Sequence, residues 1–178
     1  MNPFSVYLAG PEVFWPNAHD VLAEKVRLCE KHGLIGLSPF DNEVSHDVPP
    51  NERAVEIYTQ NIALMQKADA IIANISSFRG PNMDPGTAFE IGFFKALGKP
   101  VVLYSHDSHS LTKRVCDSEG VSYHEDPHLH FEDKQGHVIE NFGFMENLMI
   151  DLSSKHPVVK DEDNHPFEKA LKQLLTEL

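Results

Sequence analysis

The sequence predicts an α/β protein with a flavodoxin-like or Rossmann-like parallel sheet of four to five strands and helices on both faces. Over the first two thirds of the 178 residues, short apolar runs alternate with segments of helical periodicity. Several of these segments end at glycine or proline, which marks a change of element. A repeated strand–helix–strand order requires a parallel sheet covered by helices. The length fits one domain, so we expect residues 1–178 to form a single unit.

The predicted strands are short apolar runs. The first ends at the turn signal Gly10-Pro11, and its continuous apolar character is typical of a strand that is buried on both faces. We expect four such strands, over Phe4–Ala9, Leu34–Leu37, Ala70–Ile75 and Val101–Tyr104.

The predicted helices carry apolar residues at helical spacing between these strands. We expect them over residues 17–32, 51–67 and 87–97. The second helix is expected to turn the following residues toward the sheet: Val55, Ile62 and Met65.

The last third of the chain is less regular. Residues 105–140 are rich in His, Asp, Ser and Glu, so we expect a long loop excursion there rather than a second domain. Residues 141–152 and 165–178 are expected to be helices. The last helix has an apolar stripe made of Phe167, Leu171, Leu174 and Leu175.

Charge and cysteine content exclude several classes of protein. Fifteen basic and 27 acidic residues give a net charge of −12. Such a chain repels phosphate backbones and anionic lipid, so we expect no nucleic-acid or membrane partner. Cys29 and Cys116 form no disulfide framework, and no apolar run approaches the length of a membrane span. The N-terminus lacks a basic start followed by an apolar stretch, so we expect a cytoplasmic protein.

The ligand-binding edge of the predicted sheet lies beyond the carboxyl ends of its strands, where the strand order reverses. This rule points to residues 10–15, 38–43, 76–86 and the stretch after Tyr104. The candidates for substrate binding in these loops are Gly10, Asp41, Glu43 and Gly86. Phe14 and Trp15 either stack on a flat ligand ring or pack on the core.

Glu90 is the most informative residue. A helical wheel places it in the middle of an apolar arc made of Phe89, Phe93, Phe94, Ala96 and Leu97. A carboxylate in such surroundings is costly unless a function offsets the cost, which favours a catalytic role. The alternative is a capping box, Thr87-x-x-Glu90, in which Glu90 only closes the first turn of its helix. The two interpretations differ in where the side chain points.

Asp84 is a second carboxylate at the same edge. It is either a turn residue or a partner of Glu90 in one cleft. Two such carboxylates are typical of enzymes that break glycosidic bonds, one as an ionised nucleophile and one as an acid for the leaving group. The helix dipole is expected to keep Glu90 ionised. Tyr7, in the first strand, is either core or a phenol that donates a hydrogen bond to Glu90.

No metal or cofactor is expected. The closest histidine spacings, His128-Leu129-His130 and His106-x-x-His109, lie outside the predicted helices and have no nearby cysteine. No Walker A pattern occurs, and the one H-E-x-x-H match, His124–His128, lies outside the predicted helices. The turn after the first strand has one glycine rather than the G-x-G-x-x-G of dinucleotide-binding proteins.

Four segments of the chain carry motifs of a known family. They are Val6–Pro11, Ala68–Asn74, Asp84–Gly92 and Glu146–Met149. The third has the specific pattern D-x-G-x-x-x-E-x-G. In this order, and spanning most of the chain, the segments resemble the nucleoside 2-deoxyribosyltransferase family.

The resemblance implies base exchange on 2′-deoxynucleosides in nucleoside salvage, with a small-molecule 2′-deoxynucleoside and a free nucleobase as partners. The Glu90 carboxylate would attack C1′, the base would leave, and an incoming base would take its place. Mapped by motif, Asp84 would protonate and hold the departing base, and Tyr7 would orient Glu90. Phe14 would contact the substrate. Asn61, another substrate-binding candidate, stands where some members carry a carboxylate.

The resemblance also implies a homo-oligomer that needs no cofactor or metal. Pockets in this family are completed across a subunit interface. Asn147 and Met149 would therefore be supplied to the site of a neighbouring subunit.

Two alternatives keep the same fold. In the first, water replaces the acceptor base, and the protein is an N-glycoside hydrolase of deoxynucleosides or their 5′-monophosphates. A related branch grips the phosphate with a Ser- and Arg-containing glycine loop. Here the loop after the first strand has neither residue and Glu12 would repel phosphate, so a free nucleoside is the expected donor. The second alternative is a non-enzymatic nucleotide-sensing module, which would bind its ligand without Glu90.

Overall fold

A computed structural model describes residues 3–41, 47–160 and 165–178 and contains a five-stranded sheet. All five strands are parallel, in the order β2-β1-β3-β4-β7. The predicted α/β fold with a parallel sheet is therefore confirmed. The strands are β1 (Ser5–Ala9), β2 (Ile35–Leu37), β3 (Ala70–Asn74), β4 (Val101–Ser105) and β7 (Val159–Lys160).

The strand order reverses at β1. This strand pairs with β2 on one side and with β3 on the other, so that Tyr7 lies opposite Leu37 and Ile71. The chain therefore leaves β1 in one direction and returns on its other side, which opens a crevice beyond the carboxyl ends of β1 and β3. Gly10 and Asn74 stand at these two ends.

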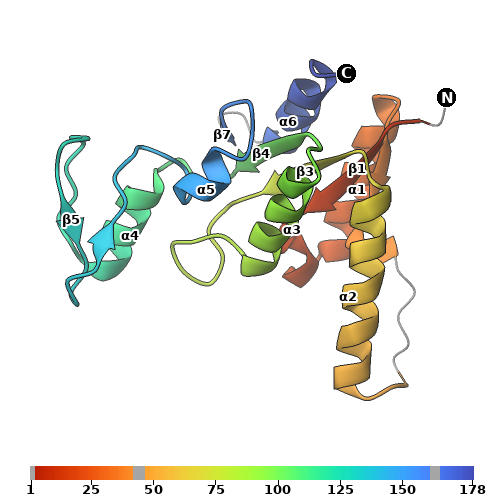
Figure 1. Cartoon of the computed structure of the whole chain (residues 1–178), viewed down its shortest axis with the longest axis horizontal. Helices are drawn as coiled ribbons and strands as arrows, with labels where there is room; N and C mark the ends of the chain where they lie inside the picture. Colours follow the sequence, from red (N-terminus) through yellow and green to blue (C-terminus); the bar gives the residue numbers. More distant parts are fainter. Residues whose placement is uncertain (1–2, 42–46, 161–164) are drawn as a thin grey trace.

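Helices cover both faces of the sheet (Figure 1). One core includes Val6, Leu8 and residues of α1 and α6, whereas the other includes Tyr7, Ala9 and residues of α2 and α3. Successive residues of β1 point to opposite faces, so this strand contributes to both cores. The helices are α1 (Ala18–Lys31), α2 (Pro50–Lys67), α3 (Pro85–Ala96) and α6 (Pro166–Leu175), with the 3-10 turns η1 (Pro11–Phe14) and η2 (Pro39–Asp41).

The N-terminal half of α2 extends past the sheet, as Figure 1 shows. Met65, near the C-terminal end of the helix, is buried, and Ile62 packs partly buried against the core. Val55 is 65% exposed, so the prediction that it faces the sheet was wrong. Helical spacing identified the correct face, but the strands are too short to cover the first turns of the helix.

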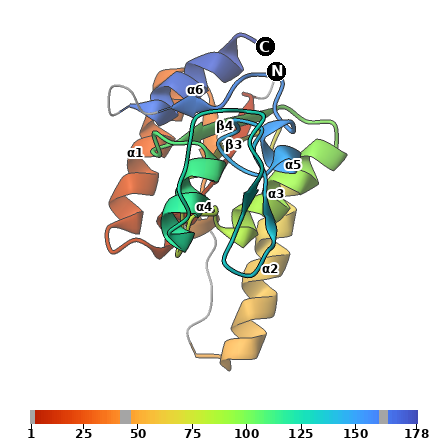
Figure 2. The same cartoon turned by 90° about the vertical axis from the view of Figure 1, so that its left-hand side faces the viewer.

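The excursion at residues 105–140 contains more structure than the predicted loop. It holds α4 (Leu111–Glu119) and an antiparallel hairpin of β5 (Phe131–Glu132) and β6 (Val138–Ile139). Both lie at one end of the molecule, which Figure 2 shows face on. A small separate core made of Cys116, Phe131 and Ile139 joins the hairpin to α4.

The caps of α4 explain why this helix forms in a polar stretch. Ser110 accepts a hydrogen bond from the N–H of Lys113, and Gly120 ends the helix in the left-handed conformation with φ of 66°. Both are strong capping residues. These signals were present in the sequence, as was the helical spacing of Leu111, Val115 and Cys116.

Residues 141–152 are mostly non-helical, contrary to the prediction. Only α5 (Leu148–Asp151) forms a helix in this segment. The Asp151 carboxylate accepts hydrogen bonds from the N–H groups of Met145 and Glu146, at 3.0 and 2.9 Å. A side chain thus satisfies backbone donors that a longer helix would have satisfied with carbonyl groups.

The described residues contain neither a helix long and apolar enough to cross a membrane nor a group of three or more potential metal ligands. His130 instead lies 3.0 Å from Glu132 in an exposed pair at the surface of the hairpin.

Candidate active site

A cavity of about 620 Å³ opens at the carboxyl end of β1, between η1, α2 and the start of α3. Its walls come from segments that are far apart in the sequence. Six of the predicted site residues line it: Gly10, Phe14, Asn61, Asp84, Gly86 and Glu90.

Glu90 points across the sheet edge toward β1. Its Oε1 accepts a hydrogen bond of 2.7 Å from the Tyr7 hydroxyl. The Tyr7 side chain is fully buried, and its ring stacks on Phe94 with centroids 5.9 Å apart. A side chain packed this tightly has few other positions, so the hydroxyl forms a fixed donor for the carboxyl group.

The start of α3 excludes the capping-box interpretation. Asp84, rather than Thr87, is the N-cap residue, and its Oδ2 accepts from the N–H and the hydroxyl of Thr87 at 2.8 and 3.0 Å. Glu90 is bonded to Tyr7 instead of closing its own helix. Asp84 therefore acts as a cap while it also lines the cavity that contains Glu90.

The prediction that Glu90 lies in the middle of the apolar face of its helix was wrong. Phe89 is 53% exposed and Leu97 is 49% exposed. The buried face of α3 consists of Thr87, Ile91 and Phe94. Glu90 therefore lies at the edge of the buried face, where a side chain can reach both the core residue Tyr7 and the cavity.

Burial dominates the electrostatics of Glu90. Desolvation raises the pKa of Glu90 to about 7, the hydrogen bond from Tyr7 acts to lower it, and the charge of Asp84 raises it further. This differs from the expectation that the helix dipole keeps Glu90 ionised. Glu90 is the sixth residue of α3, whereas the dipole acts mainly within the first turn.

Phe14 forms part of an aromatic wall at the cavity. Its ring stacks on that of Phe78, with centroids 5.2 Å apart. The guanidinium of Arg79 lies over both rings, at 5.2 and 4.6 Å from their centroids. Phe14 is 55% exposed, so this ring faces the opening rather than the core. Trp15 lines a separate hollow on the other side of η1.

One wall of the cavity, on α2, was missed by the sequence analysis apart from Asn61. Arg53, Ile57 and Asn61 follow one another at intervals of four residues and therefore share one helix face. Because Asn61 was already a candidate, this spacing could have identified Arg53 and Ile57 as further residues of the cavity. Arg53 adds a basic side chain to a cavity that also contains Asp84 and Glu90.

Glu12 does not face the cavity as a free charge. It is 1% exposed and forms a buried ion pair with Lys25. Its Oε1 also accepts from the Asn74 amide at 2.7 Å and from the Tyr104 hydroxyl at 2.9 Å. Burial acts to raise the pKa of Glu12, but Lys25 and the hydrogen bonds outweigh burial and lower it. The prediction that Glu12 would repel a phosphate was therefore wrong.

Asn147 and Met149 are not among the residues that line the cavity. Asn147 caps α5 and donates to Glu140 at 2.6 Å. Met149 is 73% exposed. Asp41 belongs to η2, and Glu43 lies outside the residues that the structure describes.

The sequence model of the family described as Nucleoside 2-deoxyribosyltransferase matches residues 6–149. This range contains Tyr7, Asp84 and Glu90, and it ends at Met149. The match thus covers both walls of the cavity and most of the chain.

Three known proteins are similar to the chain over different lengths. The structure titled "2-desoxiribosyltransferase from Leishmania mexicana" has a TM-score of 0.70 and 30% identity, with 96% of this chain and 98% of that chain covered. An uncharacterized protein from Schizosaccharomyces pombe is 31% identical over 97% of this chain and 89% of its own length. A Thermofilum pendens protein named "Putative 2'-deoxynucleoside 5'-phosphate N-hydrolase 1" is 29% identical over 54% of this chain and 64% of its own length.

Proposed function

Because this chain belongs to the nucleoside 2-deoxyribosyltransferase family, we propose that it transfers 2-deoxyribosyl groups between nucleobases through a covalent intermediate on Glu90. The observation that carries the proposal is the geometry of Glu90. Its carboxyl lines the cavity, is held by Tyr7 at 2.7 Å, and shares the cavity with the second carboxyl, Asp84.

The first half-reaction uses both carboxyl groups. The ionised Glu90 forms a bond to C1′ of the deoxyribose, and the bond from C1′ to the base nitrogen breaks. The electron pair leaves with the base, which takes a proton from Asp84. Both hydrogen bonds from Thr87 go to Oδ2 of Asp84, so Oδ1 is the atom available to the base. An incoming base reverses these steps and releases Glu90.

The test follows base exchange directly. The protein is incubated with 2′-deoxyinosine and free adenine, and deoxyadenosine and free deoxyribose are both measured. We expect deoxyadenosine, together with a deoxyribosyl adduct on Glu90 that intact-protein mass spectrometry detects. Glu90→Ala is the control and should give neither. Base exchange by this variant would disprove the mechanism. If the wild-type protein binds the nucleoside but forms no product, the result would favour a sensing module.

A second candidate function is hydrolysis of 2′-deoxynucleoside 5′-monophosphates. Arg53 on the cavity wall favours it because its guanidinium offers positive charge to a phosphate, and a relative is named for such an activity. In this case the protein would release deoxyribose 5-phosphate from deoxyinosine monophosphate. Arg53→Met would then weaken turnover of the monophosphate but not of deoxyinosine.

We further propose that the active protein is a homo-oligomer in which Asn147 and Met149 approach the cavity of a neighbouring subunit. The 73% exposure of Met149 supports this role because the side chain is available to a partner. The Asn147 amide already donates a hydrogen bond to Glu140. Asn147 would therefore contact the neighbouring subunit through its other atoms, or after its hydrogen bond to Glu140 has broken.

A further inference from the structure

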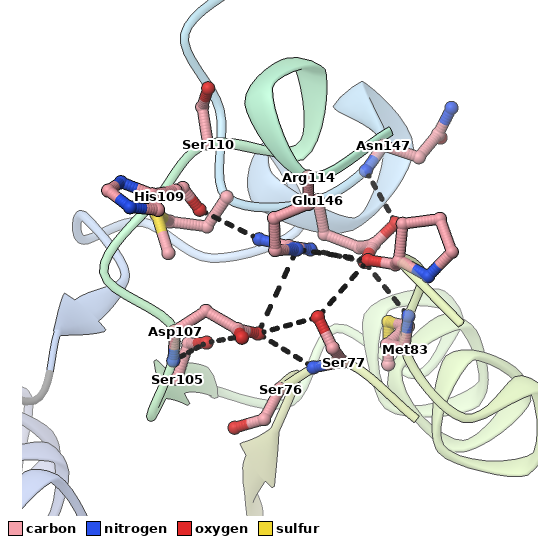
Figure 3. A network of polar contacts seen from close by, with 12 residues as sticks. Ser76, Ser77, Met83, Ser105, Asp107, His109, Ser110, Arg114, Glu146 and Asn147 are labelled. Atoms are coloured by element: carbon pink, nitrogen blue, oxygen red, sulfur yellow. Dashed lines mark hydrogen bonds and ion pairs between the residues drawn. The ribbon is translucent and has the colours of Figure 1, made fainter. Parts of the chain in front are cut away.

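Side chains from other parts of the chain hold the loop 77–83, which connects β3 to α3 (Figure 3). At its start, the Asp107 carboxylate accepts from the N–H of Ser77 at 2.7 Å and from its hydroxyl at 3.1 Å. At its end, Oε2 of Glu146 accepts from the N–H of Met83 at 3.0 Å. The backbone of the loop is therefore fixed at both ends.

Arg114, from α4, links these two anchors. Its Nη2 donates to Oε2 of Glu146 at 3.2 Å, and its Nε lies 3.9 Å from Oδ2 of Asp107. Nε also donates to the carbonyl of Pro81, inside the loop, and Nη1 donates to the carbonyl of His109, both at 2.9 Å. The side chains of Arg114 and Glu146 are only 9% and 4% exposed, so water and salt screen this pair weakly.

We propose that Arg114 and Glu146 are positioning residues that fix the loop so that Asp84 meets the departing base. The inference rests on the proposed function, in which Asp84 is the acid. Met83, which is bound to Glu146, directly precedes Asp84, and Thr87 holds Oδ2 of Asp84 from the other side. A displacement of about 1 Å at such a group costs roughly 100-fold in rate.

The chemistry of the guanidinium explains why this position needs arginine. Arg114 serves two backbone carbonyls and one carboxylate at once, with donors in a rigid planar fork. A lysine ammonium is a compact charge on a flexible stem and cannot reach all three acceptors with this geometry. Arg114→Lys therefore keeps the charge beside Glu146 while it releases the loop.

The test compares two substrates that differ in their need for an acid. The base of 2′-deoxyinosine needs a proton to leave, whereas the base of 7-methyl-2′-deoxyguanosine already carries a positive charge. We expect Arg114→Lys to lower kcat/KM for deoxyinosine by roughly tenfold or more, and for the methylated substrate by less than about threefold. Lys113→Met is the matched control. It removes an exposed ion pair with Asp117 from the same helix and should change neither value.

Equal losses on both substrates, or no loss on either, would overturn the inference. If Arg114→Lys does not fold, the double variant Arg114→Met/Glu146→Gln replaces it, since it leaves neither partner of the pair as an unpaired buried charge. The double variant should show the same substrate selectivity.

Asp84→Asn separates the two possible failures because asparagine preserves the helix cap. If Asp84→Asn does not prefer the methylated substrate, the proposed role of Asp84 fails. If Asp84→Asn has this preference and the Arg114 variants lack it, only the positioning inference fails.

Discussion

At the residue scale, the protonation of Glu90 is set by burial acting against a hydrogen bond. A pKa of about 7 means that the ionised and the protonated forms of Glu90 are both present near neutral pH. In the proposed mechanism only the ionised form attacks C1′, so the group that makes the site reactive also makes it sensitive to pH. Glu90 and its donor, Tyr7, therefore carry the three predictions that belong to this scale.

The first prediction concerns the pH dependence of catalysis. As the pH falls through about 7, Glu90 becomes protonated, so kcat/KM should fall and approach a tenfold loss per pH unit below that point. Initial rates of base exchange between pH 5 and 9 measure this acid limb. A rate that stays constant down to pH 5 would show that Glu90 is not the group whose ionisation controls attack.

The second prediction concerns Tyr7. The hydroxyl of Tyr7 lowers the pKa of Glu90, so Tyr7→Phe should move the acid limb of kcat/KM to higher pH and reduce activity at pH 7. Tyr104→Phe is the matched control, because it removes another buried hydroxyl, which contacts Glu12 instead. The same pH profile for wild type and Tyr7→Phe would contradict the orienting role.

The third prediction concerns stability. The folded state favours protonated Glu90, so the contribution of Glu90 to stability is most favourable below its ordinary pKa of 4.5 and declines as the pH rises toward about 7. Glu90→Gln avoids this loss and should be more stable than wild type at pH 8, by up to ~3 kcal/mol, and nearly equal at pH 4. Urea unfolding at both pH values measures the difference. A Gln variant that is less stable at pH 8 would contradict the burial of the charge.

At the element scale, the turn after β1 depends on the close packing of Gly10 against its neighbours. A Cβ at Gly10 would lie 2.0 Å from Oε2 of Glu12 and 2.8 Å from Cβ of Asn74. Glu12 is in turn held by Lys25 and by Tyr104. The wall of the cavity at Gly10 is therefore formed by a backbone pressed against a buried polar network.

The fourth prediction tests this packing. Gly10→Ala should destabilise the protein by ~2 kcal/mol or more, because Glu12 must move away from its buried partners. Gly92→Ala is the control, since a Cβ at this position of α3 would have no neighbour within 4 Å and alanine favours a helix. Denaturant unfolding of both variants gives the comparison. Equal stability of Gly10→Ala and wild type would show that the turn adapts.

At the scale of the whole molecule, exposed apolar side chains gather on neighbouring helices. Phe89 on α3 is 53% exposed and Met149 on α5 is 73% exposed, and α5 packs beside α3 in both Figure 1 and Figure 2. Large exposed apolar groups in one region are typical of an interface between proteins. This supports the proposed homo-oligomer.

The fifth prediction concerns this assembly. Met149→Asp should shift the protein toward the monomer and reduce base exchange, because a charge is costly in a buried interface. Leu178→Asp is the matched control, as Leu178 is 58% exposed beyond the end of α6. Sedimentation velocity measures the oligomeric state of each variant. A monomeric wild type with full activity would remove the need for a neighbouring subunit.

The first four strands of the sheet and the helices between them could be predicted from the sequence because their signals are local, whereas β7 was not predicted. Apolar runs and helical spacing placed β1, α1, β3 and α3 close to their observed bounds. The excursion was harder, since the apolar side chains of α4 pack on a small core shared with the hairpin rather than on the sheet. The hydrogen bonds of Asp151 and Glu146 could not be predicted either, because these carboxylates accept from backbone N–H groups, which every residue except proline has.

The sequence by itself determined that a parallel α/β sheet forms and that Asp84 and Glu90 lie at its carboxyl edge, because strand order and helix starts follow from local patterns. Only the tertiary structure decided that Glu12 is neutralised by Lys25 and that Arg114 anchors the loop before Asp84. Each of these depends on which distant side chains meet in space, and no local pattern encodes such a meeting.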